Sequence, residues 1–147
     1  MGAPSHFFGE YKNMADIARA VKQPHRSDPV VSKTASWSVR NSDSGKTFLF
    51  DSTTRIIATL PAITKLNDGT TFTFVVKQLD GGATGHTVTP NSANYIQYAA
   101  AGGSVTIAHS MIAAVAGDQV GQSVTLVAHY PSLSWIPKAT HGTWTKA

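Results

Sequence analysis

The sequence predicts a mainly β protein, an antiparallel β-sandwich or barrel similar to a jelly roll, with a short N-terminal helix and an extended arm. Two observations predict this class. From residue 34 onward the chain is rich in Thr, Ser, Val and Gly, and its apolar and polar residues alternate with a period of two, which is the pattern of half-buried strands. Turn-forming residues interrupt this pattern about every 8–12 residues, as in all-β domains. The strands do not alternate with helical segments, so nothing indicates a parallel sheet.

The chain divides near residue 33 into an N-terminal arm, residues 1–33, and a β domain, residues 34–147. A chain of 147 residues is long enough to bury one hydrophobic core without disulfides or a structural metal. In the arm, Pro24 and Pro29 exclude a regular helix from residues 23–31. We therefore expect this stretch to form an extended strap.

The arm also carries the one helical pattern of the chain. Apolar residues recur there at positions i, i+3, i+4 and i+7, which predicts a helix over about residues 13–22. Such a short helix is not stable alone in water, so it must dock, either on its own β domain or on a partner. Its apolar stripe and the two flanking basic residues form the expected partner-binding set: Met14, Ile17, Arg19, Val21 and Lys22.

In the β domain, each expected strand is bounded by a turn signal. Residues 41–45 (Asn-Ser-Asp-Ser-Gly) form a turn after the first strand, Pro61 ends the third strand, and residues 67–69 (Asn-Asp-Gly) predict a hairpin turn. Gly81, Gly82 and Gly85 mark a flexible loop. The expected strands cover residues 37–39, 46–51, 55–60, 71–78, 86–89, 94–98, 104–109 and 122–130, followed by a meander over 133–137 and 142–146.

The alternation also predicts which side chains fill the core. In residues 71–78, one face carries Phe72, Phe74 and Val76, and the other face carries Thr71, Thr73 and Val75. Large aromatic side chains contribute most to a core of this size. The expected core is therefore Phe48, Phe50, Phe72, Phe74 and Trp135.

The charges are few and unevenly distributed. The chain has 12 Lys and Arg, 8 Asp and Glu, and a net charge of +4, but its basic residues are spread singly, so we expect no nucleic-acid partner. Between residues 81 and 137 the single charged residue is Asp118. Interface cores are depleted of charge, so this stretch predicts self-association, with a homotrimer as the expected assembly. The alternative is an ordinary Thr- and Ser-rich β surface that lacks charge.

The sequence offers little to catalysis. It contains no cysteine, most of its aspartates lie in predicted turns, and it lacks the nucleophile-elbow, P-loop and dinucleotide motifs. Its six histidines show no metal-ligand spacing, although strands could bring His86, His109 and His129 together. We expect no enzyme activity, no cofactor and no metal. A histidine-dependent metalloenzyme is the weakest alternative.

Three aromatic residues have two interpretations. Tyr98, Trp135 and Trp144 could stack on sugar rings, as aromatic residues do in β-sandwich carbohydrate-binding modules. Alternatively, Trp135 belongs to the core, and the tyrosines line its rim or an interface. The first residues lack the apolar run of a signal peptide, and no segment is long and apolar enough to span a membrane. We therefore expect no membrane partner.

Several short motifs together carry a resemblance to a known class of proteins. They are D-S-G-K-T-F-L-F-D at residues 43–51, T-L-P at 59–61, G-T-T-F-T-F-V-V at 69–76, S-V-T-L-V at 123–127, and the closing Trp135 with G-T-W at 142–144. In this order they resemble the small β-structured virion proteins of tailed bacteriophages. These are the capsid decoration (cement) proteins and related modules of head and tail fibres. The resemblance covers about residues 36–145.

This resemblance implies a non-enzymatic structural protein, commonly trimeric, on the outer surface of a virion. The expected function is capsid decoration: the protein binds the major capsid protein on the outer capsid surface and stabilises contacts between its subunits, with the arm as the clamp. The alternative is a head-fibre, tail-fibre or spike module that binds glycans. Fibre proteins usually carry a long shaft or repeat, and this sequence shows none, which favours a decoration protein.

Overall fold

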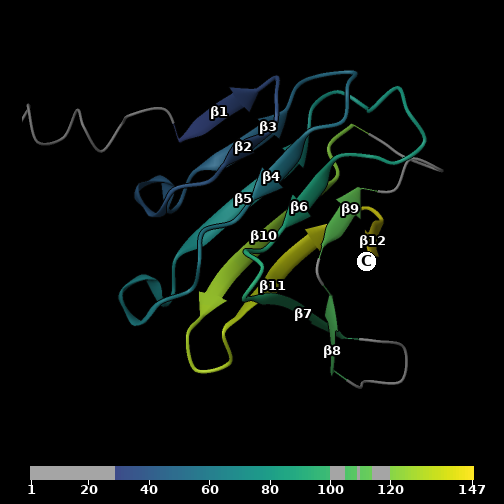
Figure 1. The fold of residues 1–147 in the computed structure, drawn as a ribbon. Helices are drawn as coiled ribbons and strands as arrows, with labels where there is room; N and C mark the ends of the chain where they lie inside the picture. The colour runs from purple at the N-terminus through teal and green to yellow at the C-terminus, as the bar shows by residue number, and fades with distance from the viewer. Residues whose placement is uncertain (1–28, 100–104, 109, 114–119) are drawn as a thin grey trace, which may run out of the picture.

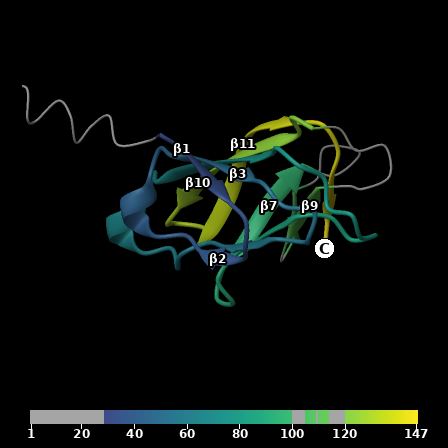
Figure 2. The same cartoon turned by 90° about the horizontal axis from the view of Figure 1, so that it is seen from above.

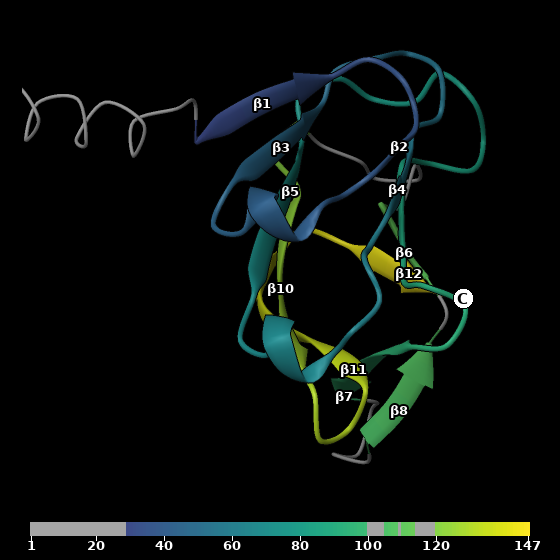
Figure 3. The same ribbon diagram turned by 60° about the vertical axis from the view of Figure 1, so that its left-hand side comes forward.

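The computed structural model describes residues 29–99, 105–108, 110–113 and 120–147. The predicted helix over residues 13–22 and its partner-binding set, Met14, Ile17, Arg19, Val21 and Lys22, lie outside these residues. The described residues form two β-sheets that face each other, so the mainly β prediction is confirmed. Figure 3 shows the two sheets on opposite sides of the domain, and Figure 2 shows β2 across from β1, β3 and β11.

The larger sheet has seven strands in the order β1-β3-β5-β10-β11-β7-β8. Its strands run diagonally across Figure 1, with β7 and β8 at one end. Their bounds are β1 Val30–Lys33, β3 Thr47–Phe50, β5 Thr71–Val76, β7 Tyr95–Ala99, β8 Val105–Ala108, β10 Ser123–His129 and β11 Ser134–His141.

The smaller sheet has five strands in the order β12-β9-β6-β4-β2. Their bounds are β2 Trp37–Ser38, β4 Ile57–Thr59, β6 Thr87–Thr89, β9 Met111–Ala113 and β12 Trp144–Lys146. Within the described residues each sheet has two unpaired edges, so the fold is sandwich-like and not a closed barrel.

The antiparallel prediction is correct for only part of the domain. From β1 to β6 the chain alternates between the two sheets, so that β1, β3 and β5 pair in parallel, as do β2, β4 and β6. A parallel pair needs a crossover connection, which is usually a helix. Here the intervening strand of the opposite sheet is the crossover, which explains why parallel pairing occurs without helices.

The corners of this winding contain two similar turns. The 3₁₀ turns η2 (Asn41–Asp43) and η3 (Lys65–Asn67) precede β3 and β5. Each is followed by a glycine with a left-handed backbone, Gly45 at φ 83° and Gly69 at φ 80°, a conformation that glycine adopts without steric cost. The hairpin predicted at residues 67–69 is wrong, because β5 pairs with β3 and β10 and not with β4.

The core lies between the two sheets, and its composition confirms the prediction. Phe50, Phe72, Phe74 and Trp135 are 0% exposed, and Phe48 is 2% exposed. The rings pack as a continuous layer: Phe48 and Phe74 stack with centroids 5.7 Å apart, and Phe72 contacts Trp135 at 5.6 Å.

Three strands differ from the expected pattern. Val30–Lys33, assigned to the arm from sequence, is a strand that pairs with β3, so the seven-stranded sheet begins before residue 34. Met111–Ala113 was not expected as a strand because its surroundings show no alternation. The last long strand extends to His141 instead of ending at Pro137.

Candidate functional site

The histidines that the structure describes do not form a metal site. No group of three His, Cys, Asp or Glu side chains suited to a metal ion occurs among the described residues. His86 is 1% exposed: its Nδ1 accepts a hydrogen bond from the Ile56 N–H at 3.0 Å, and its Nε2 lies 2.8 Å from the Gln78 carbonyl oxygen. This pattern fits a neutral ring with its proton on Nε2. His86 therefore has a structural role, and His109 lies outside the described residues.

The buried aspartate also has a structural role. Asp80 is 7% exposed and accepts backbone hydrogen bonds from Gly82 and Gly85, both at 3.0 Å. Burial raises the pKa of this carboxyl, but the two backbone hydrogen bonds and the nearby Arg55 guanidinium outweigh it, so the pKa lies below its ordinary value. Asp80 is therefore an ionised residue that organises the loop before β6.

The outer face of the seven-stranded sheet is the first candidate interaction surface. On β3, β5 and β10, every second residue points into the core, and the residues between them point outward. The pairing register places these outward residues side by side. Apart from His129 at the end of β10, none of them is ionisable, and we call the remaining set the uncharged face: Thr47, Leu49, Thr71, Thr73, Val75, Ser123, Thr125 and Val127.

At the centre of the uncharged face, two threonine hydroxyls form a hydrogen bond with each other. The Thr73 and Thr125 hydroxyls of β5 and β10 lie 2.9 Å apart. The neighbouring edge strand β1 extends the face with Val30 and Ser32, whose register partners are Thr47 and Leu49. The surface can therefore be covered without leaving a charge desolvated.

Ion pairs lie at the two ends of these strands instead of on the uncharged face. Lys46 pairs with Asp43 at 3.0 Å next to the start of β3. Lys77 pairs with Asp51 at 2.8 Å, just beyond the ends of β5 and β3. These solvent-accessible surface pairs contribute about 0–1 kcal/mol each to stability, and they border the face without interrupting it.

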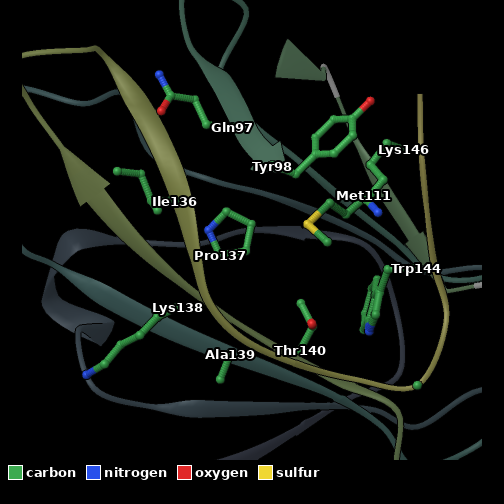
Figure 4. Close-up of a pocket in the computed structure, with 11 residues that line it drawn as sticks. Gln97, Tyr98, Met111, Ile136, Pro137, Lys138, Ala139, Thr140, Trp144 and Lys146 are labelled. Carbon is green, nitrogen blue, oxygen red and sulfur yellow. The ribbon is translucent and has the colours of Figure 1, made fainter. Parts of the chain in front are cut away.

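A pocket of about 450 Å³ is the second candidate site. It lies between β7 and β11 of one sheet and β9 and β12 of the other (Figure 4). Its wall includes Tyr98, Met111, Pro137, Thr140, Trp144 and Lys146. The volume falls in the range of about 300–1,000 Å³ that is typical of small-ligand sites.

The structure separates the three aromatic residues that were candidates for sugar stacking. Tyr98 and Trp144 both line the pocket. Trp135 is 0% exposed and packs on Phe72, so neither face of its ring is open to a sugar. Its Nε1–H has no hydrogen-bond partner among the described residues, which leaves packing as its role. The core interpretation of Trp135 therefore fits the structure.

Sequence reasoning did not find Lys146 as a member of this site. Its ammonium lies 4.8 Å from the centroid of the Tyr98 ring, a cation–π distance. The sequence contains part of the information: Lys146 lies two residues after Trp144 on a short strand, so the two side chains point to the same side. The contact with Tyr98 depends on how β7 and β12 meet, which local sequence does not encode.

Comparison with known proteins leaves the family open. A scan against protein-family models finds no match, and a search of curated proteins finds none either. Among the described residues, no helix has the length and apolar character needed to cross a membrane. The uncharged face and the pocket are therefore the two candidate sites of this domain.

Proposed function

We propose that this chain is a structural virion protein, a bacteriophage capsid decoration (cement) protein. In this role it forms a homotrimer, binds the major capsid protein on the outer capsid surface, and stabilises contacts between capsid subunits. It carries out no catalysis and needs no cofactor. The observation that carries the proposal is the uncharged face on β3, β5 and β10.

The uncharged face is suited to contact with another copy of the same chain. Burying a charged side chain without a partner costs several kcal/mol, and this face has none to bury. The chain has a net charge of +4, so copies repel one another through their other surfaces, and contact is least opposed where charge is absent. Thr, Val and Leu side chains supply apolar area at a small cost in rotamer entropy.

Trimer formation would also strengthen binding to the capsid. Each copy contributes one arm, the part of residues 1–33 that precedes β1, whose apolar stripe needs a groove. Arms on a rigid trimer bind at a high effective concentration, so individually weak contacts add up to stable attachment. Because the three arms would reach different capsid subunits, binding adds interface area between them and opposes the outward pressure of a packaged genome.

The test is a binding experiment with the full chain and purified phage capsids that lack it. We expect the protein to sediment with the capsids, to raise their melting temperature, and to have the mass of a trimer in light scattering. Deleting residues 1–28 should abolish sedimentation with capsids and leave the trimer intact. A monomer at micromolar concentration, or no binding to capsids, would contradict the proposal.

The second candidate is a head-fibre, tail-fibre or spike module that binds glycans. The observation that favours it is the meeting of Tyr98 and Trp144 in the pocket. The same capsid experiment separates the two candidates, because a fibre module would bind host-cell polysaccharide and would not coat the capsid surface.

A further inference from the structure

The pocket forms where two neighbouring strands diverge. β7 pairs with β11 only at Tyr95–Ser134 and Ile96–Trp135, while β11 continues to His141. Beyond Trp135 the two strands separate, and residues 136–140 of β11 line the opening. A register irregularity between Thr125 and Leu126, opposite this part of β11, adds to the bend.

The wall of the pocket combines an apolar side with polar groups. Met111, which is 1% exposed, forms its floor, and Pro137 points toward it in Figure 4. The Trp144 ring is fixed at one side, because its Nε1–H donates to the Ser123 carbonyl oxygen at 3.0 Å and to that of His141 at 3.3 Å. Thr140 and Gln97 add a hydroxyl and an amide to the wall.

The pocket also has an excess of positive charge. Lys138 and Lys146 line it, and no Asp or Glu follows Asp118 in the sequence. Elsewhere in the domain Lys46 and Lys77 each pair with a carboxylate. Within the part of the chain that the structure describes, neither Lys138 nor Lys146 has such a partner.

Lys146 is held in position by its surroundings. It lies opposite Met111 in the antiparallel pairing of β12 with β9, and its ammonium rests on the Tyr98 ring at 4.8 Å. The next residue, Ala147, exchanges two backbone hydrogen bonds with Ser110, at 2.9 and 3.0 Å. A positioned ammonium at an apolar wall loses little freedom when it binds an anion.

We propose that this pocket binds a sugar unit that carries a carboxylate, as uronic and sialic acids do. The carboxylate pairs with the Lys146 ammonium, and Lys138 adds to the positive potential. The apolar C–H face of the sugar packs against Tyr98, beside Trp144, of which 5% stays exposed at the pocket wall, and the sugar hydroxyls reach Thr140 and Gln97. An aliphatic acid fits less well, because it would bury these two polar side chains without hydrogen bonds.

The inference does not depend on where the protein sits on a virion, because it rests on the pocket alone. Capsid decoration and sugar binding are therefore separate predictions. A variant that loses the sugar should still bind capsids and still have the trimer mass, so failure of either proposal is visible without the other.

The test uses the full chain and two matched pairs of probes. Galacturonic acid is compared with galactose, and the methyl glycoside of sialic acid is compared with its methyl ester, by calorimetry and NMR titration. We expect at least one acid to bind about tenfold or more tightly than its neutral match, and this preference to shrink as salt rises. Lys146→Met should lower the affinity for that acid about tenfold and leave the neutral match unchanged.

Two further variants complete the test. Tyr98→Leu should weaken both members of the binding pair, because it removes the ring against which the sugar packs. Lys65→Met, in η3 and outside the pocket wall, is the control and should change neither affinity. The inference is overturned if neither acid binds at millimolar concentration, if acid and neutral probes bind equally, or if Lys146→Met and Lys65→Met behave alike.

Discussion

The two halves of the β domain are held together by different means. In the first half, β1 to β6 wind between the sheets, and the corners are fixed by buried polar side chains. Asn67, 5% exposed, accepts a hydrogen bond from the Thr64 N–H at 2.6 Å and donates to the Ala62 carbonyl oxygen at 2.8 Å. In the second half, β10 and β11 form a hairpin whose turn is closed by a backbone hydrogen bond from Leu133 to Tyr130 at 3.0 Å.

This difference follows from the connections that each half requires. A hairpin satisfies its own backbone groups in the turn, whereas a wide corner between two sheets leaves peptide groups that only side chains can reach. The first half should therefore be sensitive to loss of buried polar groups. The second half should be sensitive to steric changes where its strands diverge, and there the pocket lies.

The largest effect is expected where the two halves join on the uncharged face. Thr125 of β10 contacts Thr73 of β5 across this junction. Thr125→Lys places an ammonium at the centre of the proposed trimer contact, where desolvation costs several kcal/mol. We expect light scattering to show the monomer mass. Thr125→Val, which removes the hydroxyl and adds no charge, should keep the trimer; a trimeric Thr125→Lys protein would exclude this face from the contact.

The second prediction concerns the buried polar groups of the first half. His86→Leu removes the ring nitrogen that bonds the Ile56 N–H and the one that bonds the Gln78 carbonyl. Each backbone group left unsatisfied costs about 1–3 kcal/mol. We expect urea denaturation to show a loss of about 2–5 kcal/mol. His129, in the second half, is exposed and contacts the Ser132 hydroxyl at 2.7 Å. For the matched change His129→Leu we expect a loss below about 0.5 kcal/mol. Equal losses of unfolding free energy for the two variants would contradict the difference between the two halves.

The same contrast explains what the sequence could and could not predict. The alternation of Phe48, Phe50, Phe72 and Phe74 identifies their strands and the core, because side-chain period and burial are local properties. It cannot distinguish parallel from antiparallel partners, since both give the same alternation. The parallel winding depends on which strands meet across the sandwich, and β9 is too short to show a pattern of its own.

The candidate site shows the same limit. Tyr98 and Trp144 were recognised as aromatic candidates, but Trp135 has the same local character and lies in the core. Separating them requires the position of each strand in its sheet. The uncharged face was predictable in part, because the scarcity of charge between residues 81 and 137 covers β10. Its extension over β3 and β5 needs the register.

A third prediction compares two glycines with the same backbone conformation. Gly142 and Gly69 both have φ 80°, so an alanine at either position is strained by about 1–2 kcal/mol. At Gly69 an added Cβ meets nothing within 4 Å, whereas at Gly142 it would overlap the buried Gln122 side chain.

We therefore expect Gly142→Ala to lower the free energy of unfolding by about 1–3 kcal/mol more than Gly69→Ala, measured by urea denaturation. The double variant Gly142→Ala with Gln122→Ala should recover part of this excess. Similar losses for the two single variants would mean that Gln122 can move aside, and that the divergent end of the second half is less tightly packed than its burial indicates.

The smallest effect concerns Asp80, whose loop leads into the last parallel strand of the first half. Its carboxylate accepts two backbone hydrogen bonds, and an asparagine side chain can accept only with its single oxygen, so Asp80→Asn should cost about 1 kcal/mol at pH 7.

The pKa of Asp80 is lowered below 3.8 in the folded protein. Its stabilising contribution is therefore complete well above pH 3.8 and is lost as the pH falls through the folded pKa. We expect the difference in unfolding free energy between wild type and Asp80→Asn to be constant from pH 7 to about pH 5 and to shrink below pH 3.8. A difference that stays unchanged down to pH 2 would show that the ionised carboxylate does not hold this corner.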